Sequence, residues 1–279
     1  MSSKSSTGKA EHYIPRTDKI LLNNLWTDLL VGSSSEIEKL FQFKIFDTAK
    51  LTSILKRIIQ FSSKDCIVLD FFSGSATTAH AVMQLNAEDG GKRKFIMVQL
   101  PEKTDEKSEA FKAGYKNICE IGKERIRRAG EKIKEEAGLN GQDLDIGFRV
   151  LKLDSSNMKD IYYSADEYDQ GMLENMQSNT KEDRTDLDLL FGCLVDWGLE
   201  LDKPYTTKVI NGHKVHIYND GDLVACFEKD LDMKTIDEIA KLQALRVVFS
   251  DNSFVDSATK INVAEHFKMI APDTDIKVI

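Results

Sequence analysis

Proline is scarce in this sequence. Only four of its 279 residues are proline, and no two of these prolines are adjacent (Pro15, Pro101, Pro204 and Pro272). Any catalytic motif that contains a Pro-Pro dipeptide is therefore not carried by this chain.

Cysteine pairs and long apolar runs are also missing. The four cysteines lie far apart (Cys66, Cys119, Cys193 and Cys226), and without a Cys-x-x-Cys pair we expect neither a zinc ribbon nor a redox dithiol. No apolar run approaches the ~20 residues that cross a bilayer, and the first ten residues are polar. We therefore expect a protein of the reducing cytoplasm, with no metal centre and no membrane partner.

Positive charge is in short supply. The chain has 38 Lys and Arg residues against 46 Asp and Glu residues, which gives a net charge of −8. A protein that binds DNA by itself usually carries a basic face. Any DNA contact is therefore expected to be local, or to be made by a part of the molecule outside this chain.

The most informative segment that is present is residues 66–78, Cys-Ile-Val-Leu-Asp-Phe-Phe-Ser-Gly-Ser-Ala-Thr-Thr. The apolar run 67–69 predicts a strand buried on both faces of a parallel sheet, and a helix is expected to begin at Thr77. This order gathers backbone N–H donors and the carboxylate of Asp70 at one strand end, as in nucleotide-cofactor sites. S-adenosylmethionine suits such a site because it carries both a carboxylate and an ammonium group.

Other interpretations of this turn remain open. Only Gly74 is present where a dinucleotide fingerprint has three glycines, and the Gly-Lys-Ser/Thr of a phosphate-binding loop is absent. A dehydrogenase is therefore the weakest alternative. Small-residue turns also occur with a purely structural role, which leaves a non-catalytic interaction module as the main competitor.

The hydrophobic pattern predicts an α/β fold in two parts. The first part has a helix at 51–59, a strand–helix–strand unit over 67–98 and a long helix at 108–136. Glycines at 138 and 141 then mark a boundary. The second part is predicted to contain a strand at 147–153, a helix at 187–195, an Asn-Gly hairpin over 208–218, a strand at 223–227, helices at 236–242 and 258–267, and a strand at 246–249.

Several segments resemble a known family. Asp70-Phe-Phe-Ser-Gly-Ser-Ala-Thr-Thr-Ala-His-Ala-Val82 resembles the S-adenosylmethionine motif of amino-DNA methyltransferases, usually Asp-Pro/Phe-Phe-x-Gly-Ser-Gly-Thr-Thr. The segments 25–28, 93–102, 113–128, 246–254 and 258–263 extend the similarity to the modification (Mod) subunits of type III restriction–modification systems. These are adenine-N6 methyltransferases of the beta class.

The resemblance implies a Rossmann-like methyltransferase fold in which an Asp-Pro-Pro-Tyr motif and the target-recognition region precede the cofactor motif. Residues 1–43 would be a tail and connector from a missing catalytic half, 44–137 the S-adenosylmethionine-binding half-domain, and 138–279 a smaller C-terminal α/β domain for subunit interaction. No catalytic residue can be assigned, so we expect no methyl transfer by this chain alone and weak cofactor binding at best. The implied partners are DNA through the parent protein, a second Mod subunit and the helicase–nuclease restriction subunit.

Carried over residue by residue, the resemblance implies a cofactor site around the turn. Asp70 would contact the methionine amino group. Phe71 and Phe72 would line the pocket. Ser73, Gly74 and Ser75 would form the turn. Thr77 and Thr78 would cap the helix and reach the carboxylate end of the cofactor.

The sequence departs from the family pattern at three places near this site. Ala76 replaces a glycine, which crowds the loop if that position needs a positive φ. Gln99 stands where related enzymes often have Glu for the ribose hydroxyls, with Glu102 as an alternative. Lys50, a further cofactor contact that the resemblance implies, is followed by Leu51 where the family has a Lys-Pro pair.

Other residues that suggest a metal or DNA site at first sight have structural explanations. The odd spacing of His213 and His216 places them on opposite faces of a strand, so they cannot bind one metal ion. Residues 123–128 are basic but interleaved with glutamate, which predicts a solvated, salt-bridged helix face. We expect packing or capping by His80 and core burial of Trp26.

Overall fold

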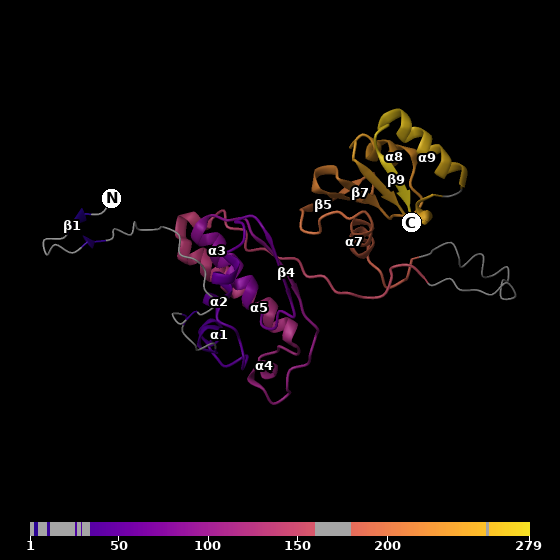
Figure 1. The fold of residues 1–279 in the computed structure, drawn as a ribbon. Helices are drawn as coiled ribbons and strands as arrows, with labels where there is room; N and C mark the ends of the chain where they lie inside the picture. The colour runs from indigo at the N-terminus through magenta and orange to yellow at the C-terminus, as the bar shows by residue number, and fades with distance from the viewer. Residues whose placement is uncertain are drawn as a thin grey trace. The chain divides into compact units, whose positions relative to one another are not determined.

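The computed structural model describes residues 3–4, 10–11, 26, 29, 34–159, 180–254 and 257–279. The chain forms two compact units, residues 1–147 and 148–279 (Figure 1). The connector predicted at 1–43 lies largely outside the described residues. The roles assigned above to the three segments remain predictions.

Unit 1 is an α/β unit built around a parallel strand pair. Its elements are β1 (Ser3–Lys4), β2 (Ala10–Glu11), α1 (Ser34–Phe41), α2 (Thr52–Ile59), β3 (Ile67–Phe71), α3 (Thr77–Asp89), β4 (Lys94–Val98), α4 (Glu109–Lys112), α5 (Ile118–Ala137) and η1 (Gly138–Gly141). β3 and β4 pair in parallel with Asp70 opposite Met97, as the strand–helix–strand pattern predicts. Helix α3 begins at Thr77, the residue expected from the sequence.

The β3–β4 sheet is covered on one face only in the described part of the chain. Val68 and Phe95 pack against a cluster from α2 and α3 that includes Ile59, Val82 and Leu85. The opposite face exposes five large apolar side chains, hereafter the bare sheet face (Ile67, Leu69, Phe71, Ile96 and Val98). The prediction that the first strand is buried on both faces is therefore wrong, because the described residues supply a helix layer on one side alone.

Unit 2 contains a five-stranded mixed sheet. Its elements are α7 (Asp186–Asp196), β5 (Tyr205–Ile210), β6 (His213–Tyr218), η3 (Asn219–Gly221), β7 (Leu223–Cys226), α8 (Met233–Ala240), β8 (Arg246–Phe249), η4 (Asp251–Ser253), α9 (Ser257–Ile270) and β9 (Asp275–Val278). The sheet order is β5-β6-β7-β8-β9, with antiparallel pairing up to β7 and parallel pairing beyond it. The predicted Asn-Gly hairpin is confirmed, since Asn211 and Gly212 both have a positive φ.

Helices cover both faces of this sheet. Leu223 and Ala225 of β7 pack with α7, whereas Val224 and Cys226 pack with α8 and α9. Figure 1 accordingly shows α7 on one side of the sheet and α8 and α9 on the other. The period of two along a strand thus divides the core of unit 2 into two apolar layers.

The strand predicted at 147–153 does not form. These residues have no regular secondary structure, and the segment is held by a side chain instead of by strand pairing. The Arg149 guanidinium lies 5.1 Å from the centre of the Phe191 ring and donates to the backbone oxygens of Lys203, at 3.1 Å, and of Leu201. Apolar alternation alone misled the prediction, because none of the strands in the described residues offers this segment a partner.

The start of α7 gives a first testable prediction. Thr185 accepts a hydrogen bond from the Asp188 N–H at 3.3 Å, and Asp188 accepts one from the Thr185 N–H at 2.8 Å, which forms a capping box. We expect Thr185→Ala to destabilise unit 2 by about 1 kcal/mol. Urea unfolding monitored by Trp197 fluorescence, in a chain with Trp26→Phe, measures the loss. Val195→Ala, on the exposed side of the same helix, should cost nothing, and equal losses in both variants would refute the cap.

Candidate functional site

The turn that joins β3 to α3 has an unusual backbone. Gly74 and Ala76 have φ values of +53° and +58°. Ala76 is the N-cap residue of α3 and carries no side-chain cap. The position where a glycine was expected therefore does adopt the left-handed conformation, which costs a non-glycine residue about 1–2 kcal/mol.

Asp70 is fixed at the end of β3 by a neighbouring hydroxyl. Thr78 donates to the Asp70 carboxylate, with 2.5 Å between Oγ1 and Oδ2. Phe71 and Phe72 follow on the exposed side of the strand end. The structure thus brings together a half-buried carboxylate and two exposed aromatic rings beside the turn.

Gln99, at the end of β4, closes the turn from the neighbouring strand. Its Oε1 accepts the Gly74 N–H at 2.7 Å, and its Nε2 donates to the Leu100 carbonyl at 3.2 Å. A ligand that uses either the Gly74 N–H or the Gln99 amide must therefore compete with this bond. Glu102 is exposed on the next loop, where its backbone oxygen accepts the Ile118 N–H at the start of α5. Lys50 is exposed just before α2.

Ser75 and Thr77 turn away from solvent. Both residues are buried, and their hydroxyl oxygens accept hydrogen bonds from Nη1 of Arg125 at 2.9 and 2.5 Å. Capping of α3 by Thr77 and Thr78 is therefore not observed. Their hydroxyls bind Arg125 and Asp70 instead.

Arg125 of α5 is fully buried beneath the turn. Its Nη2 lies 3.9 Å from Oε2 of Glu36, and neither Nε nor Nη2 has a hydrogen-bond partner among the described residues. Burial lowers the pKa of Arg125 to about 10. The guanidinium therefore remains charged at neutral pH.

His80, on the first turns of α3, is buried beside this arginine. Its Nδ1 has no hydrogen-bond partner in the part of the chain that the structure describes. Burial first, and the positive charge of Arg125 second, lower the pKa of His80 to about 4. The packing role expected for His80 is confirmed, and its imidazole is neutral at pH 7.

The prediction that residues 123–128 form one solvated, salt-bridged face is correct for the ion pairs but wrong for Arg125, which is fully buried. Glu124 pairs with Arg128 at 2.8 Å, and this bond holds the pKa of Glu124 below its usual range. Arg125, in contrast, lies four residues after the buried Ile121 and four before the buried Ala129. Helical spacing placed it on the core face, and that signal could have identified it.

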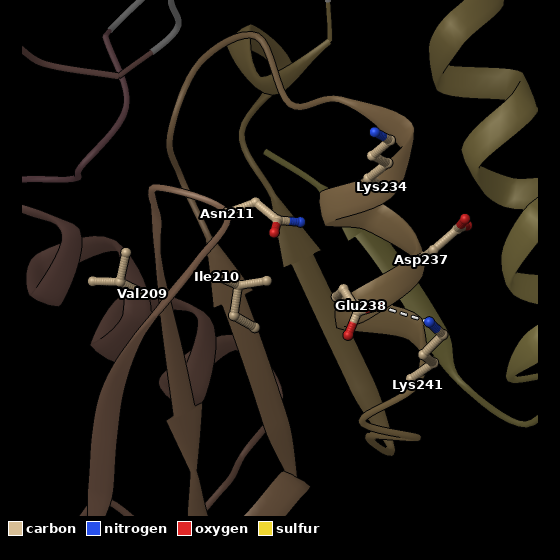
Figure 2. Close-up of a pocket in the computed structure, with 7 residues that line it drawn as sticks. All are labelled: Val209, Ile210, Asn211, Lys234, Asp237, Glu238 and Lys241. Atoms are coloured by element: carbon tan, nitrogen blue, oxygen red, sulfur yellow. Dashed lines mark hydrogen bonds and ion pairs between the residues drawn. The ribbon is translucent and has the colours of Figure 1, made fainter.

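Two surface depressions formed by described residues are weaker candidates for a functional site. A depression of about 520 Å³ lies between the end of the β5–β6 hairpin and α8 (Figure 2). Among the charged residues that line it, Glu238 pairs with Lys241 at 2.7 Å and Asp237 contacts His266 at 3.1 Å. A second depression, of about 350 Å³, lies on the loop between β4 and α5 and is lined by Pro101, Lys103, Thr104, Glu106, Phe111, Lys116 and Asn117.

The described residues form no cluster of three or more His, Cys, Asp or Glu side chains that could hold a metal ion. His216 instead contacts the Thr207 hydroxyl at 2.9 Å and Asp186 at 3.5 Å. Among the same residues, no helix is both long and apolar enough to cross a bilayer.

The turn between β3 and α3 lies in a region of the chain that is similar to known proteins. Residues 2–131 match the model of a DNA methylase family. The chain is 45% identical over 129 residues to the Mod subunit of the type III restriction-modification enzyme StyLTI of Salmonella typhimurium, which covers 45% of this chain and 20% of that protein. It is 30% identical over 255 residues to the EcoP15I Mod subunit of Escherichia coli, covering 88% of this chain and 37% of that protein.

A third relative comes from another class of system. The type II methyltransferase M.KpnI of Klebsiella pneumoniae is 36% identical over 124 residues, 43% of this chain and 30% of that protein. The chain thus spans between a fifth and two-fifths of the length of these relatives. The resemblance to type III Mod subunits is confirmed.

Proposed function

We propose that this chain, a relative of type III Mod subunits, is the cofactor-binding part of a site-specific DNA adenine-N6 methyltransferase. The observation that carries the proposal is the β3–α3 turn, with the Asp70 carboxylate at the strand end and a buried cation beneath the helix start. S-adenosylmethionine, when bound, would supply the methyl group. The Asp-Pro-Pro-Tyr motif that holds the target adenine would come from a part of the enzyme outside these residues.

The residues present fit the two charges of the amino-acid end of this cofactor. Asp70 would accept a hydrogen bond from the methionine ammonium, with Thr78 holding the carboxylate in place. The first N–H groups of α3 lack intrahelical partners and favour an anionic group, here the methionine carboxylate. Gln99 would exchange its bond with Gly74 for the ribose hydroxyls, or Glu102 would take that role.

The bare sheet face supports a missing half of the domain. Parallel strands are normally covered on both faces, yet the bare sheet face is open in the described residues. We propose that further strands and helices, carrying the catalytic motif, pack there in the complete cytoplasmic enzyme. Unit 2 would then serve contacts with a second Mod subunit or with the helicase–nuclease restriction subunit, and DNA would bind mainly to the complete enzyme.

Cofactor binding is the direct test of this function. We expect weak, saturable binding of S-adenosylmethionine by the full chain in equilibrium dialysis. Asp70→Ala should weaken it by about 10- to 100-fold, because a hydrogen bond to a charged group contributes about 1.5–3 kcal/mol. Asp154→Ala, which removes an exposed aspartate from unit 2, is the control. Unchanged binding by Asp70→Ala would show that this turn is not the cofactor site.

A methylation assay tests the missing catalytic half. We expect no transfer of labelled methyl groups from S-adenosylmethionine to adenine-containing duplex by the chain alone, and turnover would contradict this.

The competing function is a non-catalytic interaction module, which the closure of the turn by Gln99 favours. Complete absence of cofactor binding in wild-type chain would support that alternative.

A further inference from the structure

The buried guanidinium of Arg125 and its partner Glu36 connect four helices of unit 1. Arg125 of α5 binds Ser75 and Thr77 at the start of α3. Its other partner, Glu36 of α1, also accepts the Thr52 N–H at the start of α2, at 3.2 Å. Burying a charge costs several kcal/mol of folding free energy. An arginine that only filled space here would therefore destabilise the fold.

The two hydroxyls that Arg125 holds flank the strained residue of the turn. Ser75 and Thr77 stand on either side of Ala76, whose φ of +58° is unfavourable for alanine. One nitrogen, Nη1, binds both hydroxyls and so ties down the backbone on each side of Ala76. Helix α5 supports the same turn through Gly122, where a β-carbon would lie 3.5 Å from the Gly74 carbonyl oxygen.

We propose that Arg125 is the positioning residue of the cofactor turn. Through Ser75 and Thr77 it holds Ala76 in the left-handed conformation, and it places a buried positive charge beneath the end of α3 that receives the carboxylate of the ligand. The role toward the ligand rests on the proposed function, whereas the role in the turn does not.

The charge of Arg125 is only partly balanced by the described residues of unit 1. Glu36 is 3.9 Å away, which is an ion-pair distance but too long for a hydrogen bond. The neighbouring His80 is neutral at pH 7, because its pKa is lowered to about 4. The field of the guanidinium therefore adds to that of the helix N-terminus, and both favour an anionic ligand group.

Amide hydrogen exchange of the ligand-free chain tests the positioning role. We expect Arg125→Met to speed exchange of the hydrogen-bonded amides of Gly74, Ala76 and His80 about 30-fold, because two hydrogen bonds of about 1 kcal/mol each are lost. Amides of residues 84–89 and of unit 2 should keep their rates, and Arg125→Lys should recover part of the protection. Arg127→Met, on the exposed side of the same helix, is the control.

Two outcomes of this measurement would overturn the positioning role. One is unchanged exchange at Gly74, Ala76 and His80, and the other is an equal increase throughout unit 1, which is what a merely structural arginine would give. If Arg125→Met does not fold, Ser75→Ala combined with Thr77→Val removes the same hydrogen bonds and keeps the charge. Local loss of protection at the turn is expected from that pair as well.

A pair of ligands tests the electrostatic role. S-adenosylmethionine carries the carboxylate, whereas 5′-methylthioadenosine lacks the whole amino-acid group. We expect Arg125→Met to weaken binding of the first about tenfold and to leave the second unchanged, with Arg125→Lys close to wild type because it retains the charge. Equal losses for both ligands would overturn this role. If wild-type chain binds neither compound, the proposed function fails, and hydrogen exchange still decides whether Arg125 positions the turn.

Discussion

Lowering the pH from 7 to 5 is expected to destabilise unit 1 by about 2 kcal/mol through His80 alone. The pKa of His80 falls from its ordinary value of 6.5 to about 4 in the folded chain. The unfolded chain therefore binds a proton more readily than the folded one between these pH values. The stabilisation is present above pH 6.5 and is lost as the pH falls toward 4, where the total loss reaches about 3 kcal/mol.

The cause lies in the surroundings of the imidazole. Burial is the largest contribution, and the positive charges of Arg125, Lys132 and Lys56 act in the same direction. Glu36 acts in the opposite direction, but it is also the partner of Arg125. A protonated His80 would thus place a second cation beside a buried guanidinium that already lacks full compensation.

The measurement compares wild type with His80→Gln in urea unfolding between pH 5 and 7.5. Trp26 reports on unit 1 when Trp197 is replaced by Phe, since Trp26 packs against Phe61 at 6.0 Å between ring centres. Carboxylates titrate equally in both chains, so the difference in pH dependence isolates His80. His213→Gln, in unit 2, should keep the wild-type slope. A His80→Gln chain with that same slope would show that the imidazole is not desolvated.

The sequence predicted the elements whose signals are local. The Asn-Gly turn fixed the hairpin because both residues tolerate a positive φ, and β8 was predicted with its observed bounds, Arg246–Phe249, from a short apolar run. The start of α3 at Thr77 followed from the small-residue turn before it. In each case the residues that determine the conformation lie within a few positions of one another.

Features that depend on distant partners were missed. Arg125 contacts residues 48 and 50 positions away in the sequence, and these partners cannot be identified from the residues around it. Because its neighbours are basic, Arg125 was assigned to the solvated face in spite of its spacing from Ile121 and Ala129. The apolar run in β3 gave no sign that one face lacks a helix layer, because burial depends on what packs against a strand and not on the strand itself. Segment 147–153 had a strand-like pattern but lacks a pairing partner in the described chain.

Replacing Leu69 and Ile96 together by lysine should greatly reduce the tendency of this chain to self-associate. Both residues are at least half exposed, as are their neighbours Ile67 and Phe71. A contiguous apolar surface of this kind, beside strand edges without partners in the described residues, favours association. We expect 8-anilinonaphthalene-1-sulfonate fluorescence to fall on the order of fivefold, and sedimentation at rising concentration to show a monomer.

The same double variant separates assembly from stability. Leu69 and Ile96 lie outside the cluster that joins β3 and β4 to α2 and α3, so the midpoint of urea unfolding should barely change. Ile261→Lys with Met269→Lys, which replaces two apolar residues of α9 that are even more exposed, is the control and should keep the dye signal. A wild-type chain that is monomeric and binds no dye would show that the face is covered in solution. The bare sheet face could then not be the surface on which a catalytic half packs.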